Sequence, residues 1–295
     1  MKRAHGLCAD ALFFRRDNIM STLQSIAQEW EAAGRFGSKE VRMERAMRWL
    51  PYYGMICDQA ADRPFDPDSD PSGFVSIMID QGVLRPHDTL LDIGAGMGEY
   101  ALRFAKRCRS VTALEINPAG VSLMQQRAAE NSIQNLEPVC GFWEEFEPGK
   151  TFDVTFASMC PAICNVEEIQ RMERMTNRSC CLLTVLPGSY DLQRRAMMQE
   201  LKLRPEGMVT DGTRYERVLT AMGRNVRTIT KEFTSKHDLP AKTVLQQFPV
   251  YFSIFGVEES DALTYLQDYL NRNSDNGVLH DESKLLYSLL IWNVN

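Results

Sequence analysis

The sequence lacks any long apolar run. No stretch of its 295 residues approaches the ~20 consecutive apolar positions that a membrane-spanning helix needs. The apolar positions between 7 and 14 are interrupted by Asp10 and followed by Arg15 and Arg16, which argues against a signal peptide. At roughly 100–200 residues per domain, the length fits one large domain with an added cap. No membrane partner is expected.

Histidine is scarce and cysteine is scattered. The four histidines share no motif, and His237 is the least unsuitable candidate for a catalytic base. The eight cysteines fall in predicted strands and helices rather than at the spacing of a small secreted scaffold, so a reducing cytoplasm is the expected location. Cys160 and Cys164 would share one helical face, but a closed zinc site needs four ligands and no second pair matches them. No metal is predicted.

The chain also lacks an excess of positive charge. Its formal net charge of -6 argues against a broad, nonspecific grip on nucleic acid, which depends on many cationic contacts to phosphates. A local basic site remains compatible with this balance, because the stretch 194–231 carries nine basic and four acidic residues. A solvated helical face with paired charges is the favoured interpretation of that stretch, and a site for an anionic substrate is the alternative.

The most informative stretch is 89–100, a short apolar strand that runs into a glycine-rich turn and then a helix. Glycines permit positive φ and let a ligand approach the backbone closely. The first N–H groups of the following helix favour an electron-rich group at the turn. Glu115 ends the next apolar run, 111–114, at a position where doubly wound sheets bind ribose hydroxyls through an acidic side chain. The pattern predicts a nucleoside ligand.

The spacing of the glycines separates two classes of cofactor. Dinucleotide-binding proteins prefer G-x-G-x-x-G, whereas this turn has Gly94, Gly96 and Gly98. With Asp92 just inside the strand and the pair Leu114-Glu115, the segment resembles the first motif of class I S-adenosylmethionine-dependent methyltransferases. The resemblance implies a methyltransferase with S-adenosylmethionine as cofactor. It extends, with lower specificity, from about residue 72 to about residue 186.

Regular alternation of strands and helices begins at Ser72. Repeated strand-helix units imply a parallel sheet with right-handed crossovers. The predicted strands are 89–93, 111–115, 136–140, 152–157 and 180–186. In the family that the chain resembles, the last two strands form an antiparallel hairpin at the sheet edge, and 225–233 and 284–292 are the candidates. The expected fold class is α/β, with a doubly wound, mostly parallel seven-stranded Rossmann-like sheet and an N-terminal helical cap.

Two domains are expected. Residues 1–71 form the cap, with apolar positions at helical spacing near Ile19 to Trp30 and again from Val41 to Leu50. The prolines and aspartates of 63–71 forbid a regular helix and predict a linker or a lid hinge. Residues 72–295 form the methyltransferase domain, with an insertion at about 238–282 that would cover the sheet edge or contribute to the substrate pocket.

The resemblance implies a cofactor site at the carboxyl ends of the strands. Glu115 would hold the ribose, and Ile116 or Asn117 would flank the adenine. Phe142 stands where the family commonly has an aspartate, so the adenine contact falls to backbone N–H groups, Trp143 or Glu144; packing under the loop is an equally good interpretation for Trp143. The predicted cofactor-binding residues are Asp92, Gly94, Ala95, Gly96, Gly98, Glu115, Ile116, Phe142, Trp143, Glu144 and Ser158.

The loop after 152–157 is where the acceptor of this family meets the methyl group, and its candidate acceptor contacts are Ser158, Cys160 and Pro161. In enzymes that methylate base amino groups, this loop often contains an Asn or Asp followed by two prolines and an aromatic residue. The present loop lacks both the amide and the aromatic ring, which weakens a nucleic-acid interpretation. Trp49, Tyr52 and Tyr53 would close over the site as a lid, although plain packing is favoured for them.

The sequence therefore predicts in-line methyl transfer from S-adenosylmethionine to an O, N or S atom of a small-molecule acceptor. Proximity and orientation would supply most of the barrier reduction. Two alternatives stay open, a protein or RNA methyltransferase and a noncatalytic protein that binds S-adenosylmethionine or another nucleoside. The identity of the acceptor, a general base and the oligomeric state do not follow from the sequence.

Overall fold

The computed structural model describes residues 23–26, 28, 38–203 and 211–294, and it contains one mixed, mostly parallel sheet. The strand order is β3-β2-β1-β4-β5-β8-β6, with β7 paired to β8. The strands are β1 Thr89–Ile93, β2 Ser110–Glu115, β3 Leu136–Cys140, β4 Phe152–Ser158, β5 Thr176–Val185, β6 Tyr190–Asp191, β7 Arg227–Pro240 and β8 Val278–Asn293. The predicted Rossmann-like class is confirmed, and the two-residue β6 adds to the seven predicted strands.

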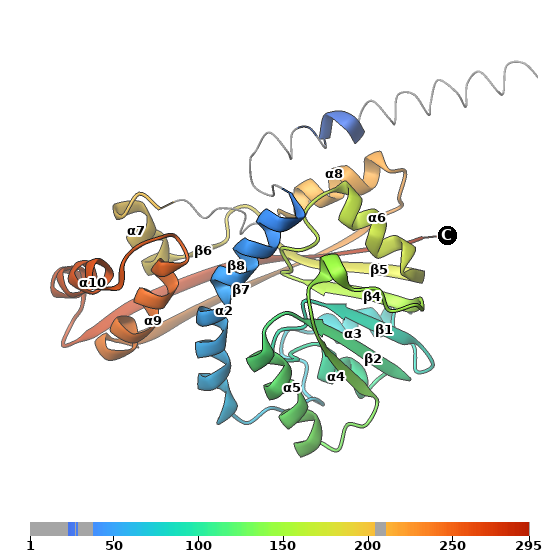
Figure 1. Cartoon of the computed structure of the whole chain (residues 1–295), viewed down its shortest axis with the longest axis horizontal. Helices are drawn as coiled ribbons and strands as arrows, with labels where there is room; N and C mark the ends of the chain where they lie inside the picture. The colour runs from blue at the N-terminus through green and yellow to red at the C-terminus, as the bar shows by residue number, and fades with distance from the viewer. Residues whose placement is uncertain (1–22, 27, 29–37, 204–210, 295) are drawn as a thin grey trace, which may run out of the picture.

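Helices cover both faces of this sheet (Figure 1). Successive residues of a strand point to opposite faces, so Leu90 joins the core cluster that contains α3 and α4, and Leu91 joins the cluster that contains α6 and α8. The helices are α2 Lys39–Ala61, α3 Phe74–Asp80, α4 Ala101–Ala105, α5 Pro118–Glu130, the 3₁₀ helix η1 Trp143–Glu145, α6 Val166–Arg174, α7 Leu192–Glu200, α8 Gly212–Ala221, α9 Ala241–Ser253 and α10 Glu259–Asn273. The first predicted cap helix falls mostly outside the described residues.

The antiparallel pair β7 and β8 is much longer than the predicted edge hairpin. Its register runs without interruption from Arg227 opposite Ile291 to Pro240 opposite Val278. Residues 238–240 and 278–282, which were assigned to the insertion, are therefore strand. Only the Tyr287–Asn293 part of β8 pairs with β5. The rest of β8 extends with β7 beyond the core, so the two strands run the length of the molecule in Figure 1.

Beyond the core, the distal half of the long hairpin carries a helical lobe made of α7, α9 and α10. A third apolar cluster holds the lobe together around Met197, Phe252 and Leu266, and Trp49 and Tyr52 of α2 pack against it. Figure 1 shows α2 standing between this lobe and the Rossmann core. The helix therefore contacts both halves of the molecule, and we refer to α7, α9 and α10 as the lobe.

The proline-rich segment 63–71 is fastened to the core. Arg107 donates hydrogen bonds to the carbonyl oxygens of Pro67 and Asp68, and Arg103 donates one to Ser69. The Phe65 ring lies between two guanidinium groups, 4.6 Å from that of Arg103 and 4.7 Å from that of Arg127. The sequence predicted that this segment forms no regular helix and serves as a linker or a lid hinge. Its contacts with Arg103, Arg107 and Arg127 hold it against the core, as in a fixed linker.

None of the helices in the described ranges has both the length and the apolar character needed to cross a membrane.

Candidate functional site

The glycine turn has the backbone conformation that its sequence predicts. Gly94, Gly96 and Gly98 have φ values of +73°, +58° and +85°, a region that strains residues with a Cβ. The N–H groups of Gly94 and Ala95 both donate to the Leu114 carbonyl at 2.9 Å, which anchors the turn to the end of β2. A Cβ on Gly98 would strike side chains beneath the turn, whereas a Cβ on Gly96 would meet no atom within 4 Å. Gly96 therefore presents an open face.

Glu115 lies directly beside this open face. Its Oε2 accepts a hydrogen bond from the Gly96 N–H at 2.7 Å, and its Oε1 accepts one from the Asn117 N–H at 2.8 Å. Burial raises the pKa of Glu115, while hydrogen bonds from Asn117, Gly96 and Ile116 oppose that shift. A carboxylate has about four lone-pair positions, so these three donors leave about one for a ligand. Asn117 itself is buried and caps α5 through the Ala119 N–H at 2.9 Å.

Asp92 is a second carboxyl group close to Glu115. It is buried in β1, and burial together with the charge of Glu115 raises its pKa to about 8. Asp92 is therefore mostly protonated at neutral pH, whereas Glu115 has three backbone donors that favour its charged form. The site combines a neutral carboxyl group and a hydrogen-bonded carboxylate at the ends of adjacent strands.

The turn after β3 contributes less to this cluster than the sequence suggested. The indole of Trp143 is 3% exposed, and its Nε1 donates to Glu168 at 2.6 Å. Arg42 of α2 contacts both Glu168, at 2.8 Å, and Glu144, at 3.3 Å. Phe142 is half-buried before η1. Trp143 therefore packs inside the protein, and the Glu144 carboxylate belongs to an ion-pair network with α2.

The loop after β4 reaches the glycine turn. A Cβ on Gly94 would lie 2.6 Å from the Cys160 sulfur, so these two residues are in direct contact. Met159 has a φ of +50° and is 42% exposed, while Ser158 is half-buried and Pro161 is exposed. Burial raises the pKa of the Cys160 thiol to about 12, which keeps it protonated at neutral pH. Cys164 is buried and does not share the exposed surface of this loop.

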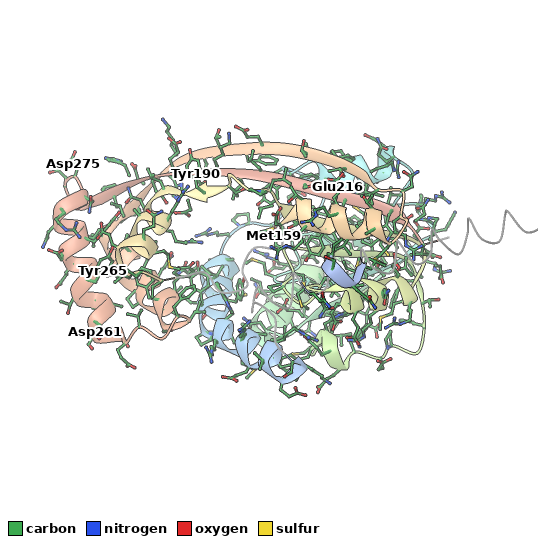
Figure 2. The ribbon with its side chains drawn as sticks, turned by 90° about the horizontal axis from the view of Figure 1, so that it is seen from above. Met159, Tyr190, Glu216, Asp261, Tyr265 and Asp275 are labelled. Atoms are coloured by element: carbon green, nitrogen blue, oxygen red, sulfur yellow. The ribbon has the colours of Figure 1, made fainter. Side chains whose placement is uncertain are left out.

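Aromatic residues of α2 border the same region. Burial raises the pKa of Tyr53 to about 12, with further contributions from Tyr52, Glu115 and Cys160, yet the side chain is 46% exposed. Tyr53 therefore lies close to Glu115 and Cys160 while part of its side chain stays accessible to solvent. We use the name acceptor recess for the surroundings of Tyr53, Met159, Cys160 and Glu115. Figure 2 labels Met159 near the middle of the molecule, between the core and the lobe.

Two residues near the recess were not found as site residues from the sequence. Tyr251 of α9 lies 5.3 Å from Tyr52 between ring centroids, and Arg194 of α7 lies over the Tyr251 ring at 4.9 Å. We call the five rings on α2, on α9 and in the turn after α9 the aromatic wall: Trp49, Tyr52, Tyr53, Tyr251 and Phe255. The excess of basic residues in 194–231 was the only sequence signal for Arg194, and nothing connected α9 to α2.

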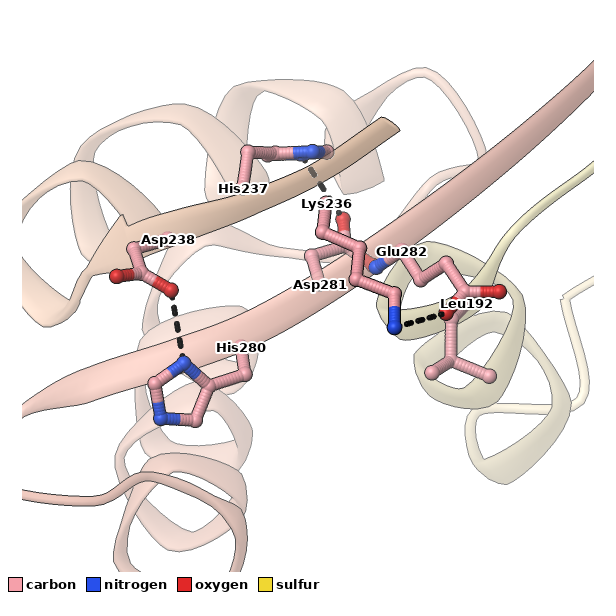
Figure 3. Close-up of a pocket in the computed structure, with 7 residues that line it drawn as sticks. All are labelled: Leu192, Lys236, His237, Asp238, His280, Asp281 and Glu282. Carbon is pink, nitrogen blue, oxygen red and sulfur yellow. Dashed lines mark hydrogen bonds and ion pairs between the residues drawn. The ribbon is translucent and has the colours of Figure 1, made fainter. Parts of the chain in front are cut away.

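His237 is placed elsewhere. Its Nε2 lies 3.3 Å from Asp281, and His280 pairs with Asp238 at 2.8 Å on the neighbouring register position (Figure 3). These residues line a hollow of about 550 Å³ at the distal hairpin. Asp281 is six residues along β8 from Tyr287, where the pairing with β5 ends, which is roughly 20 Å at 3.3 Å per residue. Within the described ranges, no group of three or more His, Cys, Asp or Glu residues could hold a metal ion.

Comparison with known proteins agrees with this geometry. Residues 90–180 match a family model described as a methyltransferase domain. A stretch of 69 residues is 36% identical to a probable ribosomal RNA small subunit methyltransferase A of Methanosarcina acetivorans, which covers 23% of this chain and 25% of that protein. A protein-L-isoaspartate O-methyltransferase 1 of a Polaromonas species is 31% identical over 108 residues, or 35% and 41% of the two chains. The matched parts of this chain thus cover between about a quarter and less than half of the length of these relatives.

A solved structure extends the likeness beyond the matched segment. The YcgJ protein of Bacillus subtilis superposes with a TM-score of 0.50 at 17% identity, over 74% of this chain and 97% of that one. At this identity the likeness concerns the fold. The chain carries a methyltransferase domain of the Rossmann-like, class I type, which is the class that the glycine turn and Glu115 predicted. It is an enzyme domain, and S-adenosylmethionine is the cofactor of its class.

Proposed function

We propose that this protein transfers a methyl group from S-adenosylmethionine to a small-molecule acceptor. The observation that carries the proposal is the open face of Gly96 beside the carboxylate of Glu115. A nucleoside could approach the turn closely at Gly96, which has no Cβ, and a ribose hydroxyl could donate a hydrogen bond to the carboxylate of Glu115. Gly94, Ala95 and Gly98 would shape the turn, and Ile116 would flank the adenine.

When bound, the cofactor supplies a methyl group on a positively charged sulfur. The protein has to bind the acceptor, orient it and exclude water, which are effects of proximity. Tyr53 and Cys160 border the acceptor recess, and both stay protonated at neutral pH because burial raises their pKa values to about 12. A protonated side chain cannot accept a proton, so neither residue would act as a general base. The acceptor would therefore bind with its nucleophilic atom already deprotonated, or it would lose its proton to water.

Helix α2 would form the cover over the bound cofactor. Asn117 donates from its side-chain amide to the Leu50 carbonyl at 3.4 Å, which holds α2 next to Glu115. Arg127 donates to the carbonyl oxygens of Met97, in the glycine turn, and Ala60, at the end of α2, at 3.3 and 3.1 Å. Two contacts therefore couple the helix to the cofactor loop, which supports a role for residues 38–61 in excluding water.

RNA methylation is the second candidate, favoured by the likeness to the probable ribosomal RNA enzyme of Methanosarcina acetivorans. The charge distribution supports the small-molecule acceptor instead. Arg224 contacts Glu173 with two hydrogen bonds of 2.8 Å, Arg227 donates to Gln81 at 2.7 Å and Lys231 donates to the Ser72 carbonyl at 2.6 Å. These basic residues of 194–231 engage separate partners rather than one shared surface.

The proposal is tested by calorimetric titration of the protein with S-adenosylmethionine and S-adenosylhomocysteine, with NAD as the control ligand. Saturable binding of the first two and no binding of NAD are expected. Transfer of radioactive methyl groups is then compared between a small-molecule extract and purified ribosomal RNA. Labelling of the RNA alone would favour the second candidate, and failure to bind either sulfur nucleoside would overturn the proposal.

A further inference from the structure

A row of rings connects Arg194 to the acceptor recess. The guanidinium carbon of Arg194 lies 4.9 Å from the Tyr251 ring centroid, and the Tyr251 and Tyr52 rings are 5.3 Å apart. Tyr52 lies 5.9 Å from Tyr53, which borders Glu115. One end of the aromatic wall therefore lies at the predicted cofactor site and the other end carries a cation.

The guanidinium of Arg194 is only partly engaged by its neighbours: it shares a hydrogen bond with Tyr251, and the side chain as a whole is 35% exposed. Its ion pair with Asp191 is 3.7 Å long, compared with about 2.7–2.9 Å for a charge-assisted hydrogen bond. The Nε atom is buried and has no hydrogen-bond partner within the described part of the chain. A buried donor without a partner requires an explanation. Because the rest of the side chain is partly exposed, a ligand that accepts hydrogen bonds can approach the guanidinium.

The charge of Arg194 is retained in this setting. Burial opposes the charged form, but Tyr52, Asp191, Tyr251 and Asp281 together raise the pKa of the guanidinium. A cation at the end of an aromatic wall repels a cationic acceptor and attracts an anionic one. The adjacent Arg195 is exposed, and Arg272 of the same lobe is paired with Glu200 and Asp268 at 3.0 Å each. Among these arginines of the described part of the lobe, Arg194 combines a buried donor with a position on the wall.

We propose that Arg194 binds a carboxylate or phosphate group of the methyl acceptor, whose flat or apolar body lies against the accessible part of the aromatic wall, where Tyr53 is 46% exposed. The inference rests on the proposed function, since it names the acceptor class of the same site. A planar guanidinium can donate two parallel hydrogen bonds to either anion, and aromatic rings provide contact area for an apolar body. The nucleophilic end of the acceptor would then point towards Tyr53 and Glu115.

The test uses three small probes that share a benzene ring and differ in charge: phenyl phosphate, benzyl alcohol and benzylamine. Binding is followed by the fluorescence of Trp49, which belongs to the aromatic wall, and a Trp49→Phe variant identifies its signal. Each titration is run with and without S-adenosylhomocysteine. The variants are Arg194→Gln, Arg194→Lys and, as the matched control on the same helix, Arg195→Gln; thermal unfolding checks that each one folds.

Phenyl phosphate is expected to bind more tightly than the other two probes. Loss of hydrogen bonds to a charged group predicts at least about tenfold weaker phenyl phosphate binding in Arg194→Gln. Arg194→Lys should retain part of the preference and Arg195→Gln all of it. Equal binding of the three probes, an unchanged preference in a folded Arg194→Gln protein, or binding of no probe would each overturn the inference. Failure to bind S-adenosylhomocysteine would instead overturn the proposed function, while the probe comparison would still decide the anion site.

Discussion

The carboxylate of Glu115 accepts a hydrogen bond from the backbone N–H of Gly96 at 2.7 Å. This contact joins the end of β2 to the open position of the glycine turn, and it places the acidic group where a ribose would lie. The same contact orients the carboxylate before a ligand arrives, which lowers the cost of ordering it on binding.

Replacing Glu115 should therefore weaken nucleoside binding. Hydrogen bonds to a charged group are worth about 1.5–3 kcal/mol, so Glu115→Ala is expected to weaken S-adenosylhomocysteine binding by roughly 10- to 100-fold. Calorimetric titration measures this loss. Glu130→Ala, at the exposed end of α5, is the control and should bind like the unchanged protein. Equal affinities of the two variants would exclude Glu115 from the cofactor site.

The glycine turn permits a sharper test, because the chain contains a matched glycine outside it. Gly96 and Gly82 have φ values of +58° and +67°, and a Cβ on either would meet no atom within 4 Å. Alanine at either position should cost about 1–2 kcal/mol of backbone strain. Denaturant unfolding should show similar destabilisation of the two variants, while only Gly96→Ala should lose S-adenosylhomocysteine affinity. Normal affinity in Gly96→Ala would place the ligand elsewhere.

Asp92 predicts a pH dependence of cofactor binding. Burial and the nearby Glu115 raise its pKa to about 8, so it carries a proton at pH 7. A bound cation favours the deprotonated carboxylate, and binding of positively charged S-adenosylmethionine near pH 7 should therefore release protons. Titrations in buffers of different ionisation enthalpy measure that release. In Asp92→Asn the release should disappear; if it persists, the protons come from another group.

The same shift has a consequence for stability. The folded state binds the Asp92 proton more tightly than the unfolded state, whose ordinary pKa is near 3.8, so this group contributes less to the free energy of unfolding as pH rises from about 4 to about 8. The unfolding temperature of Asp92→Asn, compared with that of the unchanged protein, should therefore be relatively higher at pH 8 than at pH 5. The opposite trend would contradict the raised pKa.

Trp143 is expected to stabilise the fold without contacting the cofactor. Trp143→Phe removes the hydrogen bond to buried Glu168 and should lower the free energy of unfolding by about 1–3 kcal/mol. Denaturant unfolding measures the loss, and S-adenosylhomocysteine affinity should stay within about twofold, a change of about 0.4 kcal/mol. A selective loss of affinity with unchanged stability would return Trp143 to the adenine contacts.

The sequence by itself determined the parts of this protein that depend on local interactions. The positive φ values at Gly94, Gly96 and Gly98 follow from residue type, and the apolar runs that end at Ile93 and Glu115 predict adjacent parallel strands. The turn and its acidic partner could therefore be assigned before any contact was known. The parallel pairing among β1 to β5 also followed, because repeated strand-helix units imply right-handed crossovers.

Tertiary structure alone decided which side chains face the site. Trp143 and Phe142 are neighbours in one turn, yet the indole is buried because Glu168 and Arg171 of α6 contact it. The meeting of Arg194 with Tyr251 depends on the length of β7 and β8, which carry the lobe back towards α2. Such contacts are set by packing between segments far apart in the chain, and local pattern carries no information about them.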